Sequence, residues 1–344
     1  MKILLGMSGG LDSTYAALKL LREGHSVEGA VLVMHEHTDT SSAEAAALSL
    51  GIPCHVIDCK KEFQDSVVSN FISEYLAGRT PNPCIICNSE VKFRFLLKYA
   101  RENGFDGIAT GHYAKIVRKE ARYAVAMAND PKKDQSYMLW RLSQDILSSL
   151  SFPLAEDTKQ DVRAAAKDVG LYAADKEESQ EICFVPDGDY ASYIESVCGP
   201  SKKGSFVAKD GKILGEHNGI IRYTVGQRKG LGIAFGSRVF ITDINPVDNT
   251  ITLSDVDEKC SEFFVSDIIF SGITEPRVGE KVRLRVKIRY LAPPAECTLE
   301  YLGGGRGAVI LDQPQRALTP GQSAVFYDGS CLVAGGFISA KKTQ

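Results

Sequence analysis

The stretch G-M-S-G-G-L-D-S at residues 6–13 decides the fold of the first half of the chain. An apolar run at residues 2–5 precedes it and predicts a β-strand, and residues 13–23 follow with apolar side chains at helical spacing up to Gly24. A strand, a glycine-rich turn and a helix bring consecutive backbone N–H groups and the positive end of the helix to one point. This arrangement predicts an anion-binding site of the kind that holds phosphate.

The residues of this turn indicate which phosphate compound it binds. Gly9 and Gly10 let the main chain approach a ligand without a Cβ, and the hydroxyls of Ser8 and Ser13 add hydrogen-bond donors. The stretch is neither G-x-x-x-x-G-K-[ST] nor G-x-G-x-x-G, which disfavours a Walker ATPase and a dinucleotide site. Asp12 repels phosphates unless Mg²⁺ lies between them, so the combination indicates ATP with Mg²⁺. The alternative is an ordinary turn in which Asp12 only caps a helix.

Beyond the turn, the first half alternates apolar runs with helical patterns, as a parallel α/β sheet does. Further strands are expected at residues 27–33, after Pro53 up to Asp58, and near Ile108. Helices are expected at residues 43–50, 63–77, 90–103, 135–149 and 159–169. The pattern predicts an α/β N-terminal domain with a Rossmann-like parallel sheet.

The second half has a different texture, which begins near residue 200. The stretch C-G-P-S-K-K-G at residues 198–204 is a linker by composition, and strand-like runs separated by Gly, Pro, Asn and Asp turns follow it. These runs lie at residues 239–244, 250–253, 281–288, 307–311, 323–327 and 331–334, with a polar break at 255–262. We therefore predict three domains: residues 1–199 for nucleotide binding and catalysis, a small β-rich domain at 200–261, and a small β-barrel at 262–344, for which the family resemblance described below implies tRNA contact.

Composition limits the location and partners of the chain. Its 344 residues carry a net charge of −3, which divides into −7 over residues 1–199 and +2 over each of 200–261 and 262–344. The second half can therefore contact RNA through local basic patches. No run approaches the roughly 20 apolar residues of a membrane helix, and the apolar opening is too short for a signal peptide. We expect a cytoplasmic protein, with no membrane partner, whose nine cysteines are thiols.

Three of those cysteines stand in distinctive surroundings. Cys84 and Cys87 belong to N-P-C-I-I-C-N at residues 82–88, where Pro81 and Pro83 are expected to hold the backbone out of a helix, on a rigid loop. Cys183 lies in S-Q-E-I-C-F-V at residues 179–185, and the three can converge at the C-terminal edge of the sheet. One thiolate can carry a sulfane sulfur as a persulfide, and a second thiol can release it by forming a disulfide. Inert core cysteines or a zinc site are the alternatives, although no second C-x-x-C follows.

The turn at residues 6–13 resembles the S-G-G-x-D-S loop of the PP-loop ATP pyrophosphatases, and the whole chain closely resembles one of their branches, the tRNA-specific 2-thiouridylase family (MnmA/TrmU). The resemblance runs nearly end to end, through G-M-S-G-G-L-D-S at 6–13, N-P-C-I-I-C-N at 82–88, T-G-H-Y-A at 110–114, K-D-Q-S-Y at 133–137, C-F at 183–184, Y-T-V-G-Q-R-K-G-L-G-I at 223–233, R-Y at 289–290 and T-P-G-Q at 319–322.

The resemblance implies a role for each matching position. The implied ATP-binding residues are Gly6, Met7, Ser8, Gly9, Gly10, Leu11, Asp12, Ser13, Leu32 and Gly111. Cys87 is implied as the nucleophile and Cys183 as the carrier of the persulfide. The implied tRNA contacts are Asn82, Pro83, Cys84, His112, Lys133, Asp134, Gln135, Arg289, Tyr290 and Gln322, with residues 82–84 meeting the target base.

Cys84 departs from the family pattern, because many members have Asp at this position. A thiol cannot take the acid/base role of that carboxylate unchanged. With Cys87 and Cys183 it makes a set of three thiolates of the kind that holds a [4Fe–4S] cluster with one open iron. A persulfide mechanism and a cluster mechanism therefore both stay open.

The expected activity is ATP-dependent 2-thiolation of the wobble uridine of tRNA, with Lys, Glu and Gln acceptors implied by the resemblance. ATP adenylates the C2 oxygen, sulfur attacks C2 and AMP leaves; a cysteine desulfurase or a sulfur-relay protein supplies the sulfur. Two other readings remain. A PP-loop ligase that adenylates a small molecule has no use for the three cysteines, and a metal-stapled RNA-binding protein without catalysis releases no pyrophosphate.

Overall fold

A computed structural model describes residues 1–119, 121–171, 182–185, 187–232, 238–256, 259–316 and 318–339 of the chain. Five parallel strands form the centre of its N-terminal domain, in the order β3-β2-β1-β4-β7. They are β1 (Lys2–Gly6), β2 (Ser26–Val33), β3 (Cys54–Asp58), β4 (Gly107–Thr110) and β7 (Leu150–Ser151). The expected strands at residues 2–5, 27–33, up to Asp58 and near Ile108 are thus confirmed, and with them the parallel α/β sheet.

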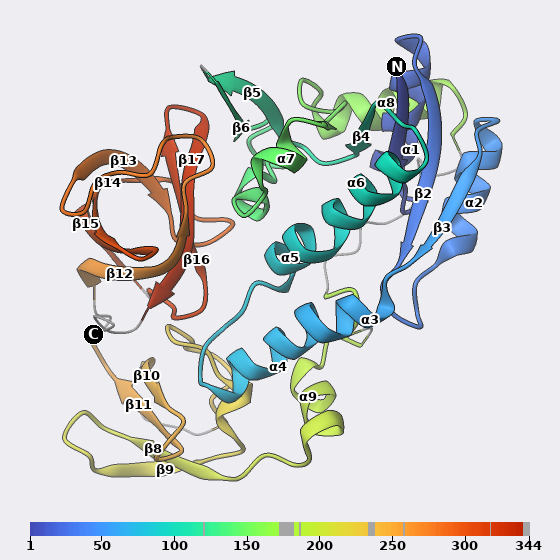
Figure 1. The fold of residues 1–344 in the computed structure, drawn as a ribbon. Coiled ribbons are helices and arrows are strands. Elements are labelled where there is room, and N and C mark those ends of the chain that lie inside the picture. The colour runs from blue at the N-terminus through green and yellow to red at the C-terminus, as the bar shows by residue number, and fades with distance from the viewer. Residues whose placement is uncertain are drawn as a thin grey trace.

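Helices cover both faces of this sheet (Figure 1). Ile3 and Leu5 of β1 point to the face packed by α1 (Leu11–Arg22), α2 (Thr40–Ser49) and α8 (Lys159–Asp168), and Leu4 points to the other. Two long helical runs cover that second face. One consists of α3 (Lys60–Phe63), the π-helical turn η1 (Gln64–Val68) and α4 (Ser69–Leu76), and the other of α5 (Pro83–Ile86), the π-helical turn η2 (Cys87–Lys92) and α6 (Phe93–Glu102). No helix among the described residues is long and apolar enough to span a bilayer.

Two expectations from the sequence were wrong in detail. The helix expected at residues 135–149 is a 3₁₀ turn, η3 (Ser136–Leu139), and a short α7 (Gln144–Leu147). Its apolar residues Tyr137, Leu139 and Trp140 are all buried, so they surround the backbone instead of forming one face of a helix. The polar break expected at residues 255–262 ends earlier, because strand β12 already begins at Lys259.

The central part of the chain forms a small four-stranded sheet in the order β10-β11-β8-β9. Helix α9 (Tyr190–Cys198) leads into it, followed by β8 (Gly204–Val207), β9 (Ile213–His217), the turn η5 (Ile220–Arg222), β10 (Phe240–Asn245) and β11 (Thr250–Ser254). Phe206, Ile251 and Leu253 form its core with the ring of Tyr223.

The last part is a closed β-barrel. Strands β12 (Lys259–Ile269), β15 (Arg306–Arg316), β14 (Ala295–Gly303), β13 (Lys281–Lys287), β16 (Ser323–Asp328) and β17 (Cys331–Ser339) pair in this order, and β12 pairs with β17 to close the ring. The hairpin of β5 (Lys115–Lys119) and β6 (Arg122–Ala126) comes from the N-terminal domain and reaches β17 through the pair Cys331–Ala126. The expected fold, an α/β domain followed by two β-rich domains with a barrel at the end, is confirmed.

The N-terminal domain and the barrel share one core at the η3 segment. Trp140 is fully buried, its Nε1 donates to Ser323 Oγ at 3.0 Å, and its ring lies 5.3 Å from that of Phe337. Gly335 makes room for it, because a Cβ there would lie 2.5 Å from the indole ring. Tyr137 adds a hydrogen bond from its hydroxyl to the carbonyl of Ser323. The barrel wall is therefore in direct contact with the domain that carries the phosphate-binding turn.

Candidate functional site

The glycine-rich turn lies between β1 and α1, at the carboxyl edge of the sheet. Gly9 has a φ of +71°, and a Cβ there would lie 2.4 Å from the backbone carbon of Ser42 in the first turn of α2. Gly10 is the extended N-cap of α1 and provides no side-chain cap, so the helix N-terminus is open to a ligand. Ser8 N–H donates to Ser13 Oγ at 3.2 Å, and Ser13 Oγ donates to the carbonyl of Gly10 at 3.1 Å. These bonds hold the turn in the shape of an anion site.

Two more of the residues implied for ATP lie beside this turn. Gly111 follows β4, and a Cβ there would come within 2.8 Å of the backbone of Asp12 and Ser13. Leu32 is buried near the end of β2, the strand next to β1. The structure thus brings residues 6–13, Leu32 and Gly111 to neighbouring strand ends, where open α/β sheets bind their ligands.

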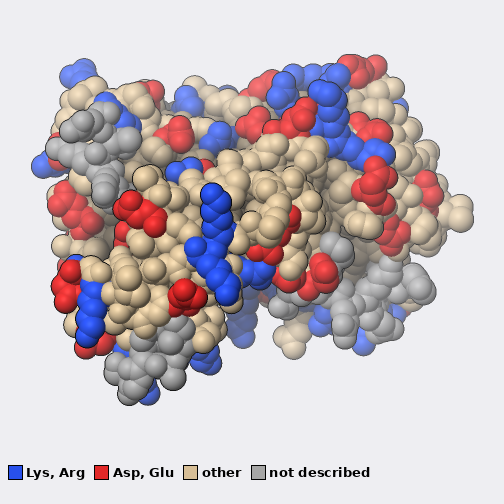
Figure 2. Space-filling model, turned by 90° about the horizontal axis from the view of Figure 1, so that it is seen from below, with Lys and Arg blue, Asp and Glu red and all other residues tan. Residues whose placement is uncertain are grey.

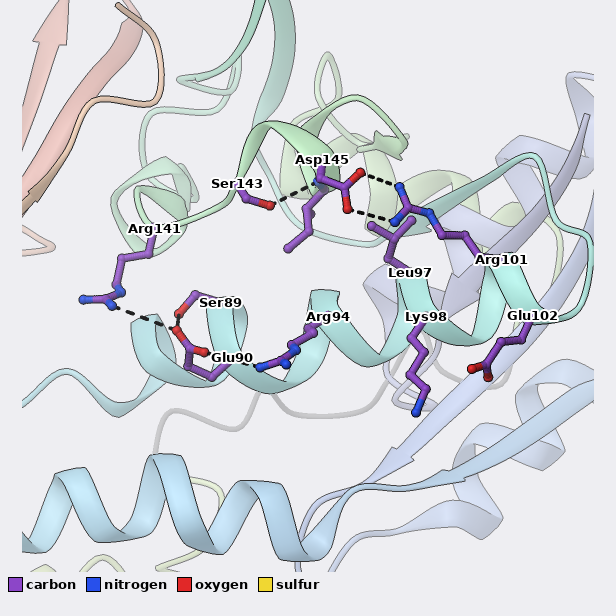
Figure 3. A pocket seen from close by; sticks show the side chains of 11 residues that line it. Ser89, Glu90, Arg94, Leu97, Lys98, Arg101, Glu102, Arg141, Ser143 and Asp145 are labelled. Atoms are coloured by element: carbon purple, nitrogen blue, oxygen red, sulfur yellow. Dashed lines mark hydrogen bonds and ion pairs between the residues drawn. The ribbon is translucent and has the colours of Figure 1, made fainter. Parts of the chain in front are cut away.

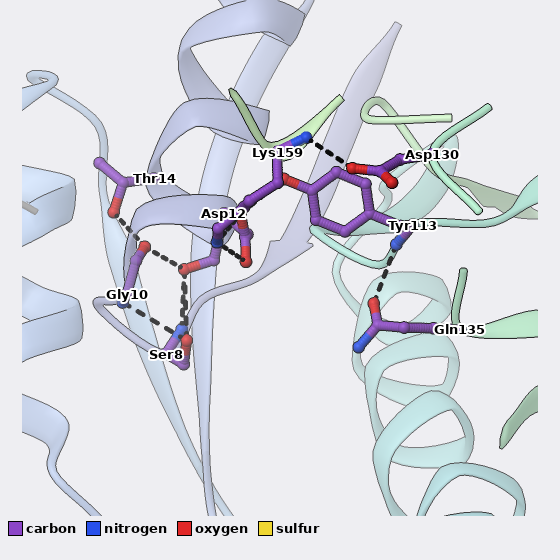
Figure 4. A network of polar contacts seen from close by, with 9 residues as sticks. Ser8, Gly10, Asp12, Thr14, Tyr113, Asp130, Gln135 and Lys159 are labelled. Atoms are coloured by element: carbon purple, nitrogen blue, oxygen red, sulfur yellow. Dashed lines mark hydrogen bonds and ion pairs between the residues drawn. The ribbon is translucent and has the colours of Figure 1, made fainter. Parts of the chain in front are cut away.

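Asp12 is the centre of a polar network at the turn (Figure 4). Lys159 Nζ, from the first residue of α8, lies 2.7 and 2.8 Å from its two carboxylate oxygens. Tyr113 donates its hydroxyl to the same carboxylate at 2.8 Å, and its backbone N–H donates to Gln135 Oε1 at 2.9 Å. Asp130 accepts the backbone N–H of Lys159 at 3.0 Å. The turn is therefore tied to two segments more than 100 residues away.

This network bears on the expected Mg²⁺. Both oxygens of Asp12 accept hydrogen bonds from Lys159, so its carboxylate is already neutralised in this arrangement. It can bind a metal ion only by giving up part of that ion pair. Mg²⁺ would therefore bind together with the nucleotide, with phosphate oxygens among its ligands, and not to this turn alone.

The segment with Cys84 and Cys87 is helical, which corrects the expectation of a rigid loop. Pro83 is the first residue of α5, a position that tolerates proline because its N–H has no helical partner in any case. Cys84 lies on α5 and is exposed, and Cys87 begins η2 and is buried. Its sulfur lies 3.5 Å from that of Met34, which directly follows β2. Cys87 is thus at the same edge of the sheet as the phosphate-binding turn.

Cys183 lies in a turn ahead of α9, with Phe184 buried against the rings of Phe63 and Phe71 at 5.5 and 5.2 Å. Residues 179–181 of its motif are outside the described part of the chain. The pKa of the Cys87 thiol is raised to about 12, with burial as the main cause; the charge of Lys92 opposes this rise, and the thiols of Cys183 and Cys84 contribute to it. The pKa of Cys183 is also raised, by desolvation of its sulfur and by Cys84, although the residue is exposed overall. Each thiol is thus close enough to affect the ionisation of another.

The three cysteines do not form a ready metal site. Within the described ranges, no three Cys, His, Asp or Glu side chains lie close enough together to hold a metal ion. Cys84, Cys87 and Cys183 therefore do not form a site for a single metal ion as they stand. Two neighbouring thiols, one buried and one exposed, suit disulfide exchange instead.

Several residues implied for tRNA binding come together where α5 meets the barrel. The side-chain amides of Asn82 and Gln322 face each other at 3.3 Å, and Gln322 Nε2 also donates to the carbonyl of Thr80 at 2.9 Å. Arg289 donates to Thr319 Oγ1 at 2.8 Å. The ring of Tyr290 lies 6.1 Å from that of Tyr137. Residues more than 200 positions apart in sequence thus form one surface next to Pro83 and Cys84.

The remaining implied tRNA residues lie deeper. Asp134 is buried, with its oxygens accepting Ser136 Oγ at 2.8 Å and the N–H of Ala128 at 3.1 Å. The ring of His112 is half-buried between Phe93 and Phe152, and desolvation together with Lys92 holds its pKa well below the usual value. Lys133 and Gln135 are half-buried. Contact with tRNA at these positions stays a prediction.

A cavity of about 650 Å³ lies beside the Cys87 helix, between η2, α6 and the segment around α7 (Figure 3). Four cations and three carboxylates line it: Arg94, Lys98, Arg101 and Arg141 with Glu90, Glu102 and Asp145. Arg101 and Asp145 form a bidentate ion pair, and Glu90 lies 3.9 Å from both Arg94 and Arg141. Figure 2 shows the same intermixing of Lys and Arg with Asp and Glu across one face of the molecule. On this face and in this cavity, cations are therefore interspersed with carboxylates and do not form one broad basic surface among the described residues.

Three residues near the reacting groups were not identified from the sequence. From the sequence, Lys159 is expected to be an ordinary surface residue at the start of a helix. Tyr113 is expected to lie at the end of a strand. Lys92 lies five residues after Cys87. This spacing brings two residues to the same side of a π-helical turn such as η2, but not of an α-helix. For Lys159, only the T-K-Q-D capping pattern at residues 158–161 hints at the position, and it says nothing of Asp12.

Three family models match consecutive parts of the chain. They are described as a tRNA methyl transferase HUP domain at residues 1–187, a tRNA methyl transferase PRC-barrel domain at 192–255 and an aminomethyltransferase beta-barrel domain at 260–338. The chain is 44% identical to the tRNA-specific 2-thiouridylase MnmA of Acetivibrio thermocellus, over 98% of the chain and 99% of the relative. It is 42% identical to the proteins of the same name from Clostridium botulinum Alaska E43 and Clostridioides difficile 630, over 98% of both sequences in each case.

Proposed function

The chain belongs to the tRNA-specific 2-thiouridylase family, and from that premise we propose that it replaces the C2 oxygen of the wobble uridine of tRNA by sulfur, at the expense of ATP. The observation that carries the proposal is the placement of Cys87. Its sulfur lies against Met34 at the end of β2, on the sheet edge that also holds the phosphate-binding turn after β1. An oxygen activated at the turn and a sulfur delivered by the thiols would meet at that edge.

In the proposed reaction the C2 oxygen of the uridine attacks the α-phosphorus of ATP, and pyrophosphate leaves. Cys183 carries the sulfur as a persulfide, and the thiolate of Cys87 attacks the inner sulfur, so that a Cys87–Cys183 disulfide forms and hydrosulfide is freed. The hydrosulfide attacks C2, and AMP leaves with the former oxygen. Two electrons from an external thiol then reduce the disulfide.

The surroundings of the two cysteines support this division of roles. Cys183 is exposed, so a sulfur donor can reach it, whereas Cys87 is buried and accessible mainly to a group already in the site. Its raised pKa keeps Cys87 a thiol in the resting protein, and the positive charge of Lys92 opposes that effect. The nucleophile would thus be protected until a partner sulfur is placed beside it.

The cluster mechanism is the alternative, and it differs from the persulfide route in its need for iron. Iron and acid-labile sulfide would be measured in protein purified without oxygen, together with thiolation by that same sample. Full activity without iron supports the persulfide route, and activity that follows iron content overturns it.

The partners follow from the same proposal: tRNAs for Lys, Glu and Gln, and a cysteine desulfurase or a sulfur-relay protein that loads Cys183. We further propose that the reaction takes place in the cytoplasm. The domain limits at residues 199 and 261 are likewise part of this proposal.

The test of the function uses the purified protein with a tRNA transcript, ATP labelled in the α-phosphate and a persulfide donor. AMP, pyrophosphate and 2-thiouridine should appear in equal amounts, and Cys183→Ala should abolish 2-thiouridine. A small-molecule ligase would keep its turnover in Cys183→Ala, and a protein that only binds RNA would release no pyrophosphate. Either result excludes the proposed function.

A further inference from the structure

The nucleotide site contains a lysine that no sequence motif marks. The turn itself carries no Lys or Arg between residues 6 and 13, and its single charged side chain, Asp12, is negative. Backbone dipoles alone would then have to hold the phosphate chain of a nucleotide against a carboxylate. Lys159 supplies the missing positive charge, with its Nζ at 2.7 and 2.8 Å from the Asp12 oxygens.

Lys159 is held at that position by the start of α8. Thr158 caps the helix through a reciprocal pair of hydrogen bonds with Asp161, and Asp130 accepts the N–H of Lys159. The lysine side chain is only 10% exposed, and its ammonium lies 6.0 Å from the centre of the Tyr113 ring (Figure 4). A buried ammonium is costly unless a negative group faces it, so the site favours an anion beside Lys159 in every state.

The geometry points to a direct contact: we propose that Lys159 binds the phosphate chain of ATP, and that Asp12 and Tyr113 hold its ammonium ready in the absence of nucleotide. The proposal rests on the assignment of residues 6–13 as the ATP site. A polyphosphate entering the turn brings more negative charge than one carboxylate, so it competes with Asp12 for the same ammonium.

A simpler role would be that Lys159 only cancels the charge of Asp12. The two roles differ in a double-variant comparison, with the affinity for Mg·ATP measured by calorimetry in the full-length protein without tRNA. If Lys159 contacts phosphate, Lys159→Met weakens binding about tenfold or more, as the loss of a charged hydrogen bond does. Adding Asp12→Asn to that variant does not restore the affinity. If Lys159 only cancels Asp12, the double variant binds as tightly as the wild type, and the proposal is overturned.

Lys19→Met is the matched control. Lys19 also joins α1 to the start of α8, through an ion pair with Asp157 at 2.6 Å, but it lies two turns further along α1 than Asp12. Its replacement should leave the ATP affinity within about twofold, and Lys159→Arg should retain most of it because the charge is kept. Equal losses in Lys19→Met and Lys159→Met would indicate loosening of α8 and would contradict a phosphate contact. Thiolation by the wild type tests the proposed function separately, since ATP binding is measured here without tRNA or sulfur.

Discussion

At the scale of single residues, the thiol of Cys87 sets the pH response of the site. Its pKa is raised to about 12, with burial as the first cause and the positive charge of Lys92 as the first opposing one. A thiol with a raised pKa is protonated at neutral pH, and its thiolate fraction grows with pH up to that pKa.

Replacement of Lys92 by Met is expected to raise the pKa of Cys87 further, because a favourable charge is removed. Sulfur transfer should fall by about tenfold for each unit of pKa, and the loss should be the same at pH 7.5 and pH 9, because both lie below the pKa of the thiol. The measurement is the single-turnover rate of 2-thiouridine formation across this pH range. Lys98→Met, on the exposed side of the adjoining α6, is the control and should follow the wild-type profile. A Lys92→Met profile identical to that of the wild type would contradict the electrostatic role.

Gly9 gives a second prediction at this scale. Gly9→Ala puts a Cβ 2.4 Å from the backbone of Ser42 at a φ of +71°, so the turn must change shape and ATP binding should be lost. Gly24→Ala is the matched control, because Gly24 also has a positive φ of +83° but open space around it. It should cost about 1 kcal/mol of stability and keep its affinity for ATP. Calorimetry with ATP and thermal unfolding of both variants make the comparison.

At the scale of elements, the start of α8 positions Lys159. Thr158 Oγ1 accepts the N–H of Asp161 at 3.2 Å, and Thr158→Ala removes this cap at a cost of about 1 kcal/mol. The helix start should loosen, and the affinity for ATP should fall by less than in Lys159→Met. Thr158→Ser keeps the hydroxyl and should restore both stability and affinity. Denaturant unfolding and ATP titration of the two variants are the measurements, and a Thr158→Ser variant as weak as Thr158→Ala would exclude the capping explanation.

The sequence predicts elements well where one residue pattern determines them. The turn at residues 6–13, strands β1 and β2 and helix α8 follow from local signals of glycine, alternation and capping. Residues 136–140 do not follow such a local pattern, because Tyr137, Leu139 and Trp140 are all buried at the junction with the barrel. The helical start at Pro83 was missed because proline was read as a breaker, whereas at the first position of a helix it is favourable.

The candidate site shows the same limit. Spacing along the chain identifies Gly9, Asp12 and the C-x-x-C pair, because each lies in a compact motif. Lys159 cannot be found in this way, since its partner Asp12 is 147 positions earlier and the contact arises only when α8 packs on α1. Lys92 needs the extra residue of a π-helical turn to face Cys87. Such residues become visible only in three dimensions.

At the scale of the whole molecule, the packing of Trp140 against the barrel joins the domains. Gly335→Ala puts a Cβ 2.5 Å from the indole ring, and overpacking of this kind costs about 1–3 kcal/mol. Gly329→Ala, on the turn between β16 and β17 with nothing within 4 Å, is the control and should cost about 1 kcal/mol through its positive φ of +59°. Thermal unfolding of the two variants tests whether this junction matters more than an ordinary barrel turn.

The core that runs through this junction also determines how the protein comes apart. Val325, Tyr327 and Leu332 of the barrel belong to the same buried cluster as Leu4 of the central sheet and Phe71 of α4. A fragment ending at residue 199 would expose Trp140 to solvent, because the barrel that packs against it is missing. The isolated barrel would likewise expose Tyr327. Of the three domains predicted from the sequence, the first and the last are thus not independent folding units, and calorimetry should record the N-terminal domain and the barrel melting in a single cooperative transition.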